Sequence, residues 1–166
     1  MIEMNSFKDA VDKISNRFEN SFLGKEAEKA DVHSDDYDAP LAKEVNSAIK
    51  NKLDGLQREH DVEEELERQY PLEKGYSVIS EAYLRNENGT IVKDTVTGEA
   101  RRIDFVVAKD EKVVDSIEVT SKTADKTAQT AKELRIREAG GNYIRDYEGN
   151  LIEIPPEVHT RIERRD

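Results

Sequence analysis

The feature that most constrains the fold is a pair of strand-like runs joined by a short charged turn, residues 103–122, which read IDFVVAKDEKVVDSIEVTSK. Val, Ile and Phe dominate both runs, and these residues favour β-strands. Two such runs so close together in the sequence predict an antiparallel hairpin. Each run also contains one carboxylate among apolar neighbours, Asp104 in the first and Glu118 in the second.

The length of the turn decides whether these two acids meet. If the turn occupies residues 110–112, Lys109 pairs with Val113 and Asp104 lies opposite Glu118, whereas a turn shorter by one residue moves the register by one. Directly opposed residues have Cβ atoms about 4.5–5.5 Å apart, and like charges at that distance are destabilising. A divalent cation held between the two carboxylates would reverse the sign of the interaction.

Further polar residues follow the second acid. Side chains alternate along a strand, so Thr120 and Lys122 are expected on the face of Glu118. Two carboxylates with a nearby amine suit metal-assisted cleavage of phosphodiesters, in which the lysine stabilises the phosphate and the hydroxyl orients water or a ligand. Lys122, Lys126 and Gln129 recur at i, i+4 and i+7, a polar line able to bind a phosphate backbone. The competing interpretation is a solvated edge hairpin in a non-catalytic interaction module.

The charge distribution leaves a nucleic-acid substrate open for the second part of the chain. The formal net charge is −11, which disfavours a general electrostatic attraction to nucleic acid. Residues 100–166 carry 13 Lys and Arg against 14 Asp and Glu, so most of the acidity precedes them. Cysteine is absent, which excludes disulfides and thiolate metal sites. No apolar run approaches the ~20 residues of a membrane span.

The first part of the chain is expected to be helical. Residues 1–36 combine a helical period over 7–18 with a polar segment that has no period, and they are interpreted as a helical lead-in and a flexible link. Residues 37–166 are predicted to form the main domain. Its helical pattern runs over 41–70, as two helices or as one helix broken near Gly55.

The remainder of the main domain predicts three strands, a helix and a final β element. In order, these are expected over residues 76–85, 101–108, 112–120, 123–139 and 142–154. The order of elements is therefore α-β-β-β-α-β, a mixed α/β fold.

This order and its acids resemble the PD-(D/E)XK nuclease superfamily, which places an acid on a helix, an Asp on the second strand and Glu-x-Lys on the third. More narrowly, GEARRIDFVV and IEVTSKTADKTAQTAKELRIREAGGNYI are similar to the C-terminal toxin domains of contact-dependent growth inhibition proteins, the CdiA type. The resemblance covers about residues 60–154 and is specific over 98–145. It implies a restriction-endonuclease-like core and nuclease activity.

The resemblance assigns roles to individual residues. Asp104 matches the second-strand metal ligand and Glu118 the third-strand acid. Thr120 stands where the superfamily often has its lysine, and Lys122 is the proposed replacement. Gln129 resembles a glutamine that some members carry on the next helix, where it is expected to bind substrate together with Lys126.

The helical acid has several candidates in DVEEELERQYP. Val62, Leu66 and Tyr70 mark the buried stripe of this helix, so the acid should flank that stripe. Glu64 is favoured, with Glu67 next. The full set of candidates is Glu63, Glu64, Glu65 and Glu67.

The resemblance also implies a biological setting. Such domains are delivered into a target bacterium from a larger exported cell-surface protein, act in its cytoplasm and are neutralised by a dedicated immunity protein. The junction tetrapeptide VENN typical of these toxins is absent from this chain. The expected cofactor is a divalent metal ion, Mg²⁺ before Zn²⁺ or Mn²⁺. Transfer RNA is favoured over DNA by family analogy, and no base-reading motif separates the two substrates.

Overall fold

The computed structural model describes residues 39–166, with side chains described from residue 44. The chain divides into two compact units, Met1–His60 and Asp61–Asp166, and each is described by itself. The predicted lead-in and link over residues 1–36 lie outside the described part. The elements are α3 (Ala39–Gln69), a 3-10 turn (Leu72–Lys74), β1 (Ser77–Tyr83), β2 (Arg102–Lys109), β3 (Lys112–Ser121), α4 (Thr127–Glu138), β4 (Tyr143–Arg145), β5 (Leu151–Glu153) and β6 (Arg161–Arg165).

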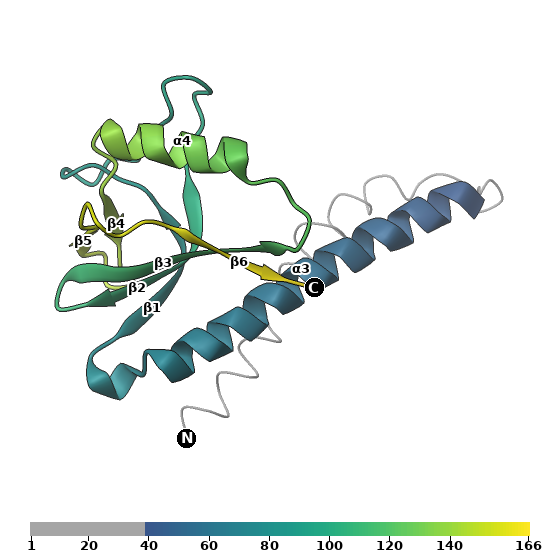
Figure 1. The fold of residues 1–166 in the computed structure, drawn as a ribbon, viewed down its shortest axis with the longest axis horizontal. Helices are drawn as coiled ribbons and strands as arrows, with labels where there is room; N and C mark the ends of the chain where they lie inside the picture. The colour runs from purple at the N-terminus through teal and green to yellow at the C-terminus, as the bar shows by residue number, and fades with distance from the viewer. Residues whose placement is uncertain (1–38) are drawn as a thin grey trace. The chain divides into compact units, whose positions relative to one another are not determined.

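A single mixed sheet forms the centre of the second unit (Figure 1). β1, β2 and β3 are antiparallel neighbours, and β3 is long enough to have two partners along its other side. Its beginning bridges β5 and its end pairs with β6, and both of these pairings are parallel. The predicted mixed α/β class is therefore confirmed, with the antiparallel hairpin β4–β5 inserted before the last strand.

The last strand was not predicted. The final β element expected over 142–154 is present as β4 and β5, but the strand that extends the main sheet beside β3 is β6. β6 has four charged residues and one apolar residue, Ile162, which is 37 % exposed. A strand of this composition carries no alternation of apolar and polar residues, and it forms because β3 offers an unpaired edge.

The long helix α3 is continuous, so the predicted break near Gly55 is wrong. The predicted buried stripe is confirmed within the second unit. Val62 and Leu66 are each 2 % exposed, and Tyr70, one residue after the helix, packs against the same cluster. The other buried members of this cluster come from one face of the sheet: Phe105, Val107, Ile117 and Val119.

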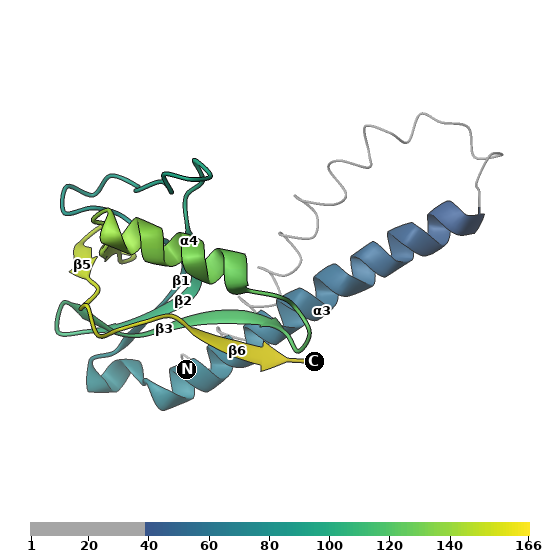
Figure 2. The same cartoon turned by 45° about the horizontal axis from the view of Figure 1, so that its top comes forward.

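Helix α4 covers the opposite face of the sheet (Figures 1 and 2). Its Ile136 is fully buried and packs in a larger apolar cluster with Val106 and Ala108 of β2. Because residues alternate along a strand, Val106 and Ala108 point away from the face that contacts α3. Val106 and Ala108 therefore face α4, whereas this alternation does not extend to the start of β2, where Ile103 belongs to the same cluster.

Two glycines end α4 where the sequence predicts. Gly140 has a φ of 98°, a left-handed conformation that favours glycine. Its backbone N–H donates to the carbonyl of Arg137 at 3.2 Å, and that of Gly141 donates to the carbonyl of Ile136 at 2.9 Å. This pair of bonds is the Schellman motif, which satisfies the last carbonyls of the helix.

The turn between β2 and β3 is shorter than predicted. It contains two residues, Asp110 and Glu111, with φ of 52° and 63°, the signs that a type I′ turn requires. Near the turn, the pairing is therefore one residue away from the predicted register. A β-bulge in the hairpin adds one residue to β3 and restores the predicted register, in which Phe105 pairs with Ile117.

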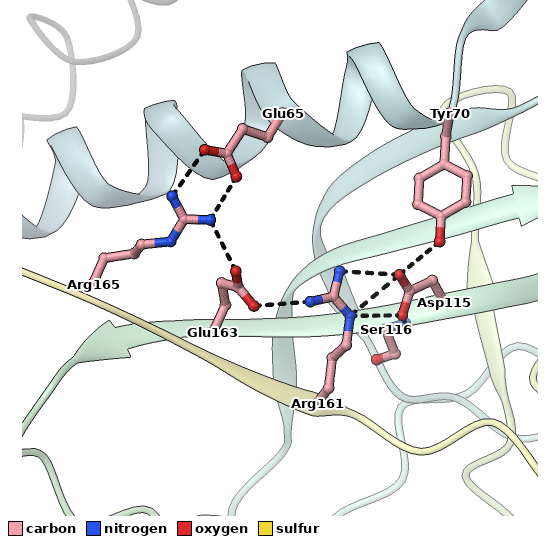
Figure 3. A network of polar contacts seen from close by, with 7 residues as sticks. All are labelled: Glu65, Tyr70, Asp115, Ser116, Arg161, Glu163 and Arg165. Atoms are coloured by element: carbon pink, nitrogen blue, oxygen red, sulfur yellow. Dashed lines mark hydrogen bonds and ion pairs between the residues drawn. The ribbon is translucent and has the colours of Figure 1, made fainter.

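A line of alternating acids and arginines ties β6 to β3 and to the end of α3 (Figure 3). Its donor–acceptor distances lie between 2.5 and 3.2 Å. Most of these side chains are partly exposed, so each single ion pair contributes little and their joint effect is to anchor the strand. In order, the line contains Glu65, Arg165, Glu163, Arg161, Asp115 and Tyr70.

Candidate functional site

A buried carboxylate lies at the centre of the candidate site. Glu118, near the end of β3, is 6 % exposed. Its Oε2 accepts a hydrogen bond from Nη2 of Arg101 at 3.0 Å, and its Oε1 accepts from Nζ of Lys126 at 3.2 Å and from Nε2 of Gln129 at 3.0 Å. Nζ of Lys126 also donates to Oε1 of Gln129 at 3.0 Å. The carboxylate therefore has three donors, two of them positively charged.

Arg101 connects this carboxylate to a second one. It is 5 % exposed, lies in the connection between β1 and β2, and donates through Nε to Oε1 of Glu133 at 3.1 Å. Burial by itself would raise the pKa of Glu118, but Arg101 and then Lys126 more than offset it, so the pKa lies below its usual value of 4.5. Glu118 is therefore ionised at neutral pH despite its burial.

Asp104 lies next to this carboxylate across the hairpin. The β2–β3 pairing reaches Phe105 and Ile117, the residues next to Asp104 and Glu118. Oδ2 of Asp104 accepts a hydrogen bond from the backbone N–H of Val119 at 2.9 Å. The two residues predicted to bind metal are therefore on neighbouring strands, with Asp104 bonded to the residue that follows Glu118.

The lysine that contacts Glu118 is not the one assigned from the sequence. Lys122 follows the end of β3, where its Nζ pairs with Oδ2 of Asp166 at 2.9 Å and its side chain is 63 % exposed. It has left the strand, so the alternation of side chains no longer applies to it. Lys126, at the start of α4, is the lysine that contacts Glu118. Thr120 keeps its position two residues after Glu118 and is 8 % exposed.

The four helical acids lie in different surroundings. Glu65 accepts two hydrogen bonds from Arg165 of β6, at 2.9 and 2.5 Å (Figure 3). Glu63 and Glu64 are half-buried, and Glu67 is exposed. Within the described part of the chain, the side-chain partners of the buried carboxylate come from α4, from the residue before it and from the β1–β2 connection, not from α3.

Sequence reasoning missed two residues of the polar network around Glu118, namely Arg101 and Glu133. Arg101 directly precedes β2, and nothing in its spacing distinguishes a buried arginine from the exposed Arg102 that follows it. The position of Glu133 could have been recognised from its spacing in the sequence. It follows Gln129 by four residues and therefore continues the polar line of α4 that begins at Lys126.

The carboxylate oxygens of this site are ligands that suit a hard cation. Within the described part of the chain, no group of three or more His, Asp or Glu side chains could hold a metal ion. Asp104 and Glu118 are a set of two carboxylates, and Mg²⁺ usually binds one or two carboxylates together with waters and substrate phosphates. Zn²⁺ sites take three or four protein ligands, commonly His or Cys. The residues therefore fit Mg²⁺ better than Zn²⁺, and Mn²⁺ accepts the same oxygen ligands.

Comparisons with known proteins identify no relative, since no family model, curated protein or solved structure matches this chain. Among the described helices, none has both the length and the apolar character needed to span a membrane. Function is therefore inferred from the residues of the site.

Proposed function

We propose that this protein is a metal-dependent nuclease with a restriction-endonuclease-like core, and that it cleaves phosphodiester bonds. The observation that carries the proposal is the buried, ionised Glu118 on β3, with Asp104 of β2 bonded to the backbone N–H of the next residue, Val119. Two carboxylates that leave room for waters and substrate phosphates are a usual ligand set for Mg²⁺, so a divalent cation is the proposed ligand of this pair. With the β4–β5 hairpin taken as an insertion before β6, the order of the elements follows the α-β-β-β-α-β order of the superfamily that the sequence resembles.

Each side chain of the cluster has a role in this proposal. Asp104 and Glu118 hold the divalent ion, with Mg²⁺ as the first choice. When bound, such an ion lowers the pKa of the attacking water and offsets the charge on the phosphate. Lys126 replaces Lys122 as the residue that stabilises the phosphate, because its Nζ lies 3.2 Å from Glu118. Thr120, on the same face, orients water or a ligand.

Two further residues complete the proposed site. Gln129 binds substrate beside the lysine, since its amide already contacts both Lys126 and Glu118. Glu64 is kept as the helical acid, because it is half-buried and flanks the buried stripe of α3.

The substrate class and setting follow from the family that the sequence resembles. We propose a bacterial antagonism toxin that is delivered from an exported cell-surface protein and acts in the cytoplasm of the target cell. Transfer RNA is the first substrate to test, with DNA second. A cognate immunity protein is the proposed partner.

A second function is favoured by one observation. The carboxylate of Glu118 already has Arg101, Lys126 and Gln129 as partners, and no buried side-chain nitrogen or oxygen among the described residues lacks a hydrogen bond. Such a satisfied network is also what a purely structural polar core requires. A non-catalytic interaction module is therefore the alternative.

Incubation of the purified chain with total transfer RNA and with plasmid, in Mg²⁺ and in EDTA, separates the two functions. The nuclease proposal expects loss of one substrate in Mg²⁺ only. Asp104→Asn and Glu118→Gln should abolish cleavage, by a factor of at least about 100, while the circular dichroism spectrum stays unchanged. Intact substrates with Mg²⁺, Mn²⁺ and Zn²⁺ would support the interaction module instead.

The two lysines provide a matched pair of variants. Lys126→Ala should reduce cleavage by about 100-fold, because it removes the amine beside the carboxylates. Lys122→Ala removes an exposed amine of the same type that pairs with Asp166, and it should change cleavage by less than about twofold. The reverse ranking would return the catalytic role to Lys122.

A further inference from the structure

The segment between β3 and α4 carries the lysine of the site and is held from outside the site. Lys126 is its last residue before α4. Nη1 of Arg164, on β6, donates hydrogen bonds to the backbone carbonyls of Ala124 at 2.8 Å and of Ser121 at 3.1 Å, with that of Lys122 at 3.4 Å. One nitrogen of this guanidinium therefore contacts three carbonyls of the segment between residues 121 and 124.

The pairing of β6 with β3 explains how this arginine reaches the segment. In the parallel register, Ile162 is the partner of Glu118 and Arg164 is the partner of Thr120. β6 thus runs beside the half of β3 that carries the site, and Arg164 arrives where β3 ends. The charged composition of β6 then has a reason, because the strand supplies side chains for polar contacts and adds almost nothing to the apolar core.

The next residue along β6 makes different contacts. Arg165 donates to Glu65 of α3 and to Glu163, as Figure 3 shows, and belongs to the line of ion pairs on the side of the sheet that α3 covers. Neighbouring residues of a strand point to opposite faces. Arg164 therefore contacts the segment before α4, whereas the adjacent Arg165 contacts α3.

We propose that Arg164 is a positioning residue of the site, which holds the segment 121–126 so that Nζ of Lys126 stays beside Glu118. This inference rests on the proposed nuclease function for its catalytic consequence. Arg164 touches neither of the proposed metal ligands and acts only through the backbone that Lys126 is attached to. Without it, three carbonyls turn to water and the segment gains conformational freedom, which lowers the fraction of molecules with the lysine in place.

The test compares Arg164→Gln with Arg165→Gln, which removes an equal charge from the next position of the same strand. Hydrogen exchange of the backbone amides of 121–126 is measured first and does not depend on any activity. Arg164→Gln should speed this exchange by about tenfold, which corresponds to a free energy of opening that is lower by roughly 1.4 kcal/mol. Arg165→Gln should leave the exchange of the segment unchanged. Equal exchange in the segment for both variants overturns the inference.

Cleavage kinetics then test the positioning role. Arg164→Gln should lower kcat by about tenfold or more with little change in KM, since substrate binds but the lysine is misplaced. Arg164→Lys keeps the charge and part of the hydrogen bonding, and it should recover part of kcat and of the slow exchange. Equal losses of kcat in Arg164→Gln and Arg165→Gln would show general destabilisation and overturn the positioning role.

The same experiments separate this inference from the proposed function. If the unmodified protein cleaves neither substrate, the nuclease proposal fails and the catalytic part of this inference fails with it, while the exchange data still decide whether Arg164 holds the segment. If cleavage occurs and both variants keep full kcat and slow exchange, the nuclease proposal stands and Arg164 has no positioning role.

Discussion

Replacing Arg101 by methionine should destabilise the protein strongly, because it leaves buried carboxylates without their principal partner. The side chains of Arg101 and Glu118 are 6 % and 8 % exposed, and that of Glu133 is 12 % exposed. Removing one partner of a buried ion pair costs about 3–5 kcal/mol. Lys126 remains bonded to Glu118, so we expect the lower end of that range, about 3 kcal/mol. For a folded unit of this size, the melting temperature should fall by at least ~10 °C.

The pH dependence of this loss identifies its cause. In the folded protein the pKa of Glu118 lies below its usual value of 4.5. Its ionised form therefore contributes stability that is present above pH 4.5 and is lost as the pH falls toward the lower folded pKa. In Arg101→Met, burial is no longer offset by the arginine, so the pKa of Glu118 should rise. Protonation then removes the buried charge, and the variant should approach the unmodified protein in acid.

Urea unfolding followed by circular dichroism at pH 7 and pH 4 measures both effects. The difference in free energy of unfolding should be about 3 kcal/mol at pH 7 and clearly smaller at pH 4. The double variant Arg101→Met with Glu118→Gln should recover part of the loss at pH 7, because it removes the stranded charge. A wild-type urea midpoint for the single variant, or a difference that is equal at the two pH values, would refute this reasoning.

Gly141→Ala should lower the free energy of unfolding by about 1–3 kcal/mol, because a Cβ there would lie 2.6 Å from Cγ2 and 2.9 Å from the carbonyl oxygen of Ile136; an unchanged urea midpoint would contradict this. Gly55→Ala is its control, since a Cβ inside α3 meets nothing closer than 3.7 Å and should add about 0.5–1 kcal/mol to the stability of the helix, measured by thermal melting. Asp94→Asn should lower the melting temperature by about 5 °C or more, because Asp94 is buried and accepts two 2.8 Å bonds from Arg135. These bonds hold the pKa of Asp94 well below its usual 3.8, so the difference between the two proteins should be equal at pH 7 and pH 5; a gap that shrinks by pH 5 would disprove this assignment.

Several features of the fold were predictable because they depend on residues close together in the sequence. The strands of the hairpin follow from β-branched residues, and the alternation along β3 placed Ile117 and Glu118 on opposite faces. The helical period marked Val62 and Leu66 as buried, and both are. The end of α4 follows from the glycines after it.

The register of the hairpin shows where local reasoning reaches its limit. The sequence predicted the pairing of the acids from a three-residue turn, whereas the structure has a two-residue turn and a bulge. Both routes lead to the same register at Phe105. A bulge depends on how the strand packs against its neighbours, and no residue pattern in the sequence indicated it.

By itself, the sequence determined the elements from α3 to β5, the opposite faces of Ile117 and Glu118, and the two acids as candidates, because each depends on neighbours within one strand or one turn of helix. Tertiary structure alone decided that Lys126 and not Lys122 contacts Glu118, and that Arg101 is buried between Glu118 and Glu133. The strand β6 also depends on tertiary structure, because its charged residues carry no strand pattern and it forms by pairing with the edge of β3. Contacts between distant segments depend on where the backbone ends each element, and a shift of one residue there changes which side chain arrives.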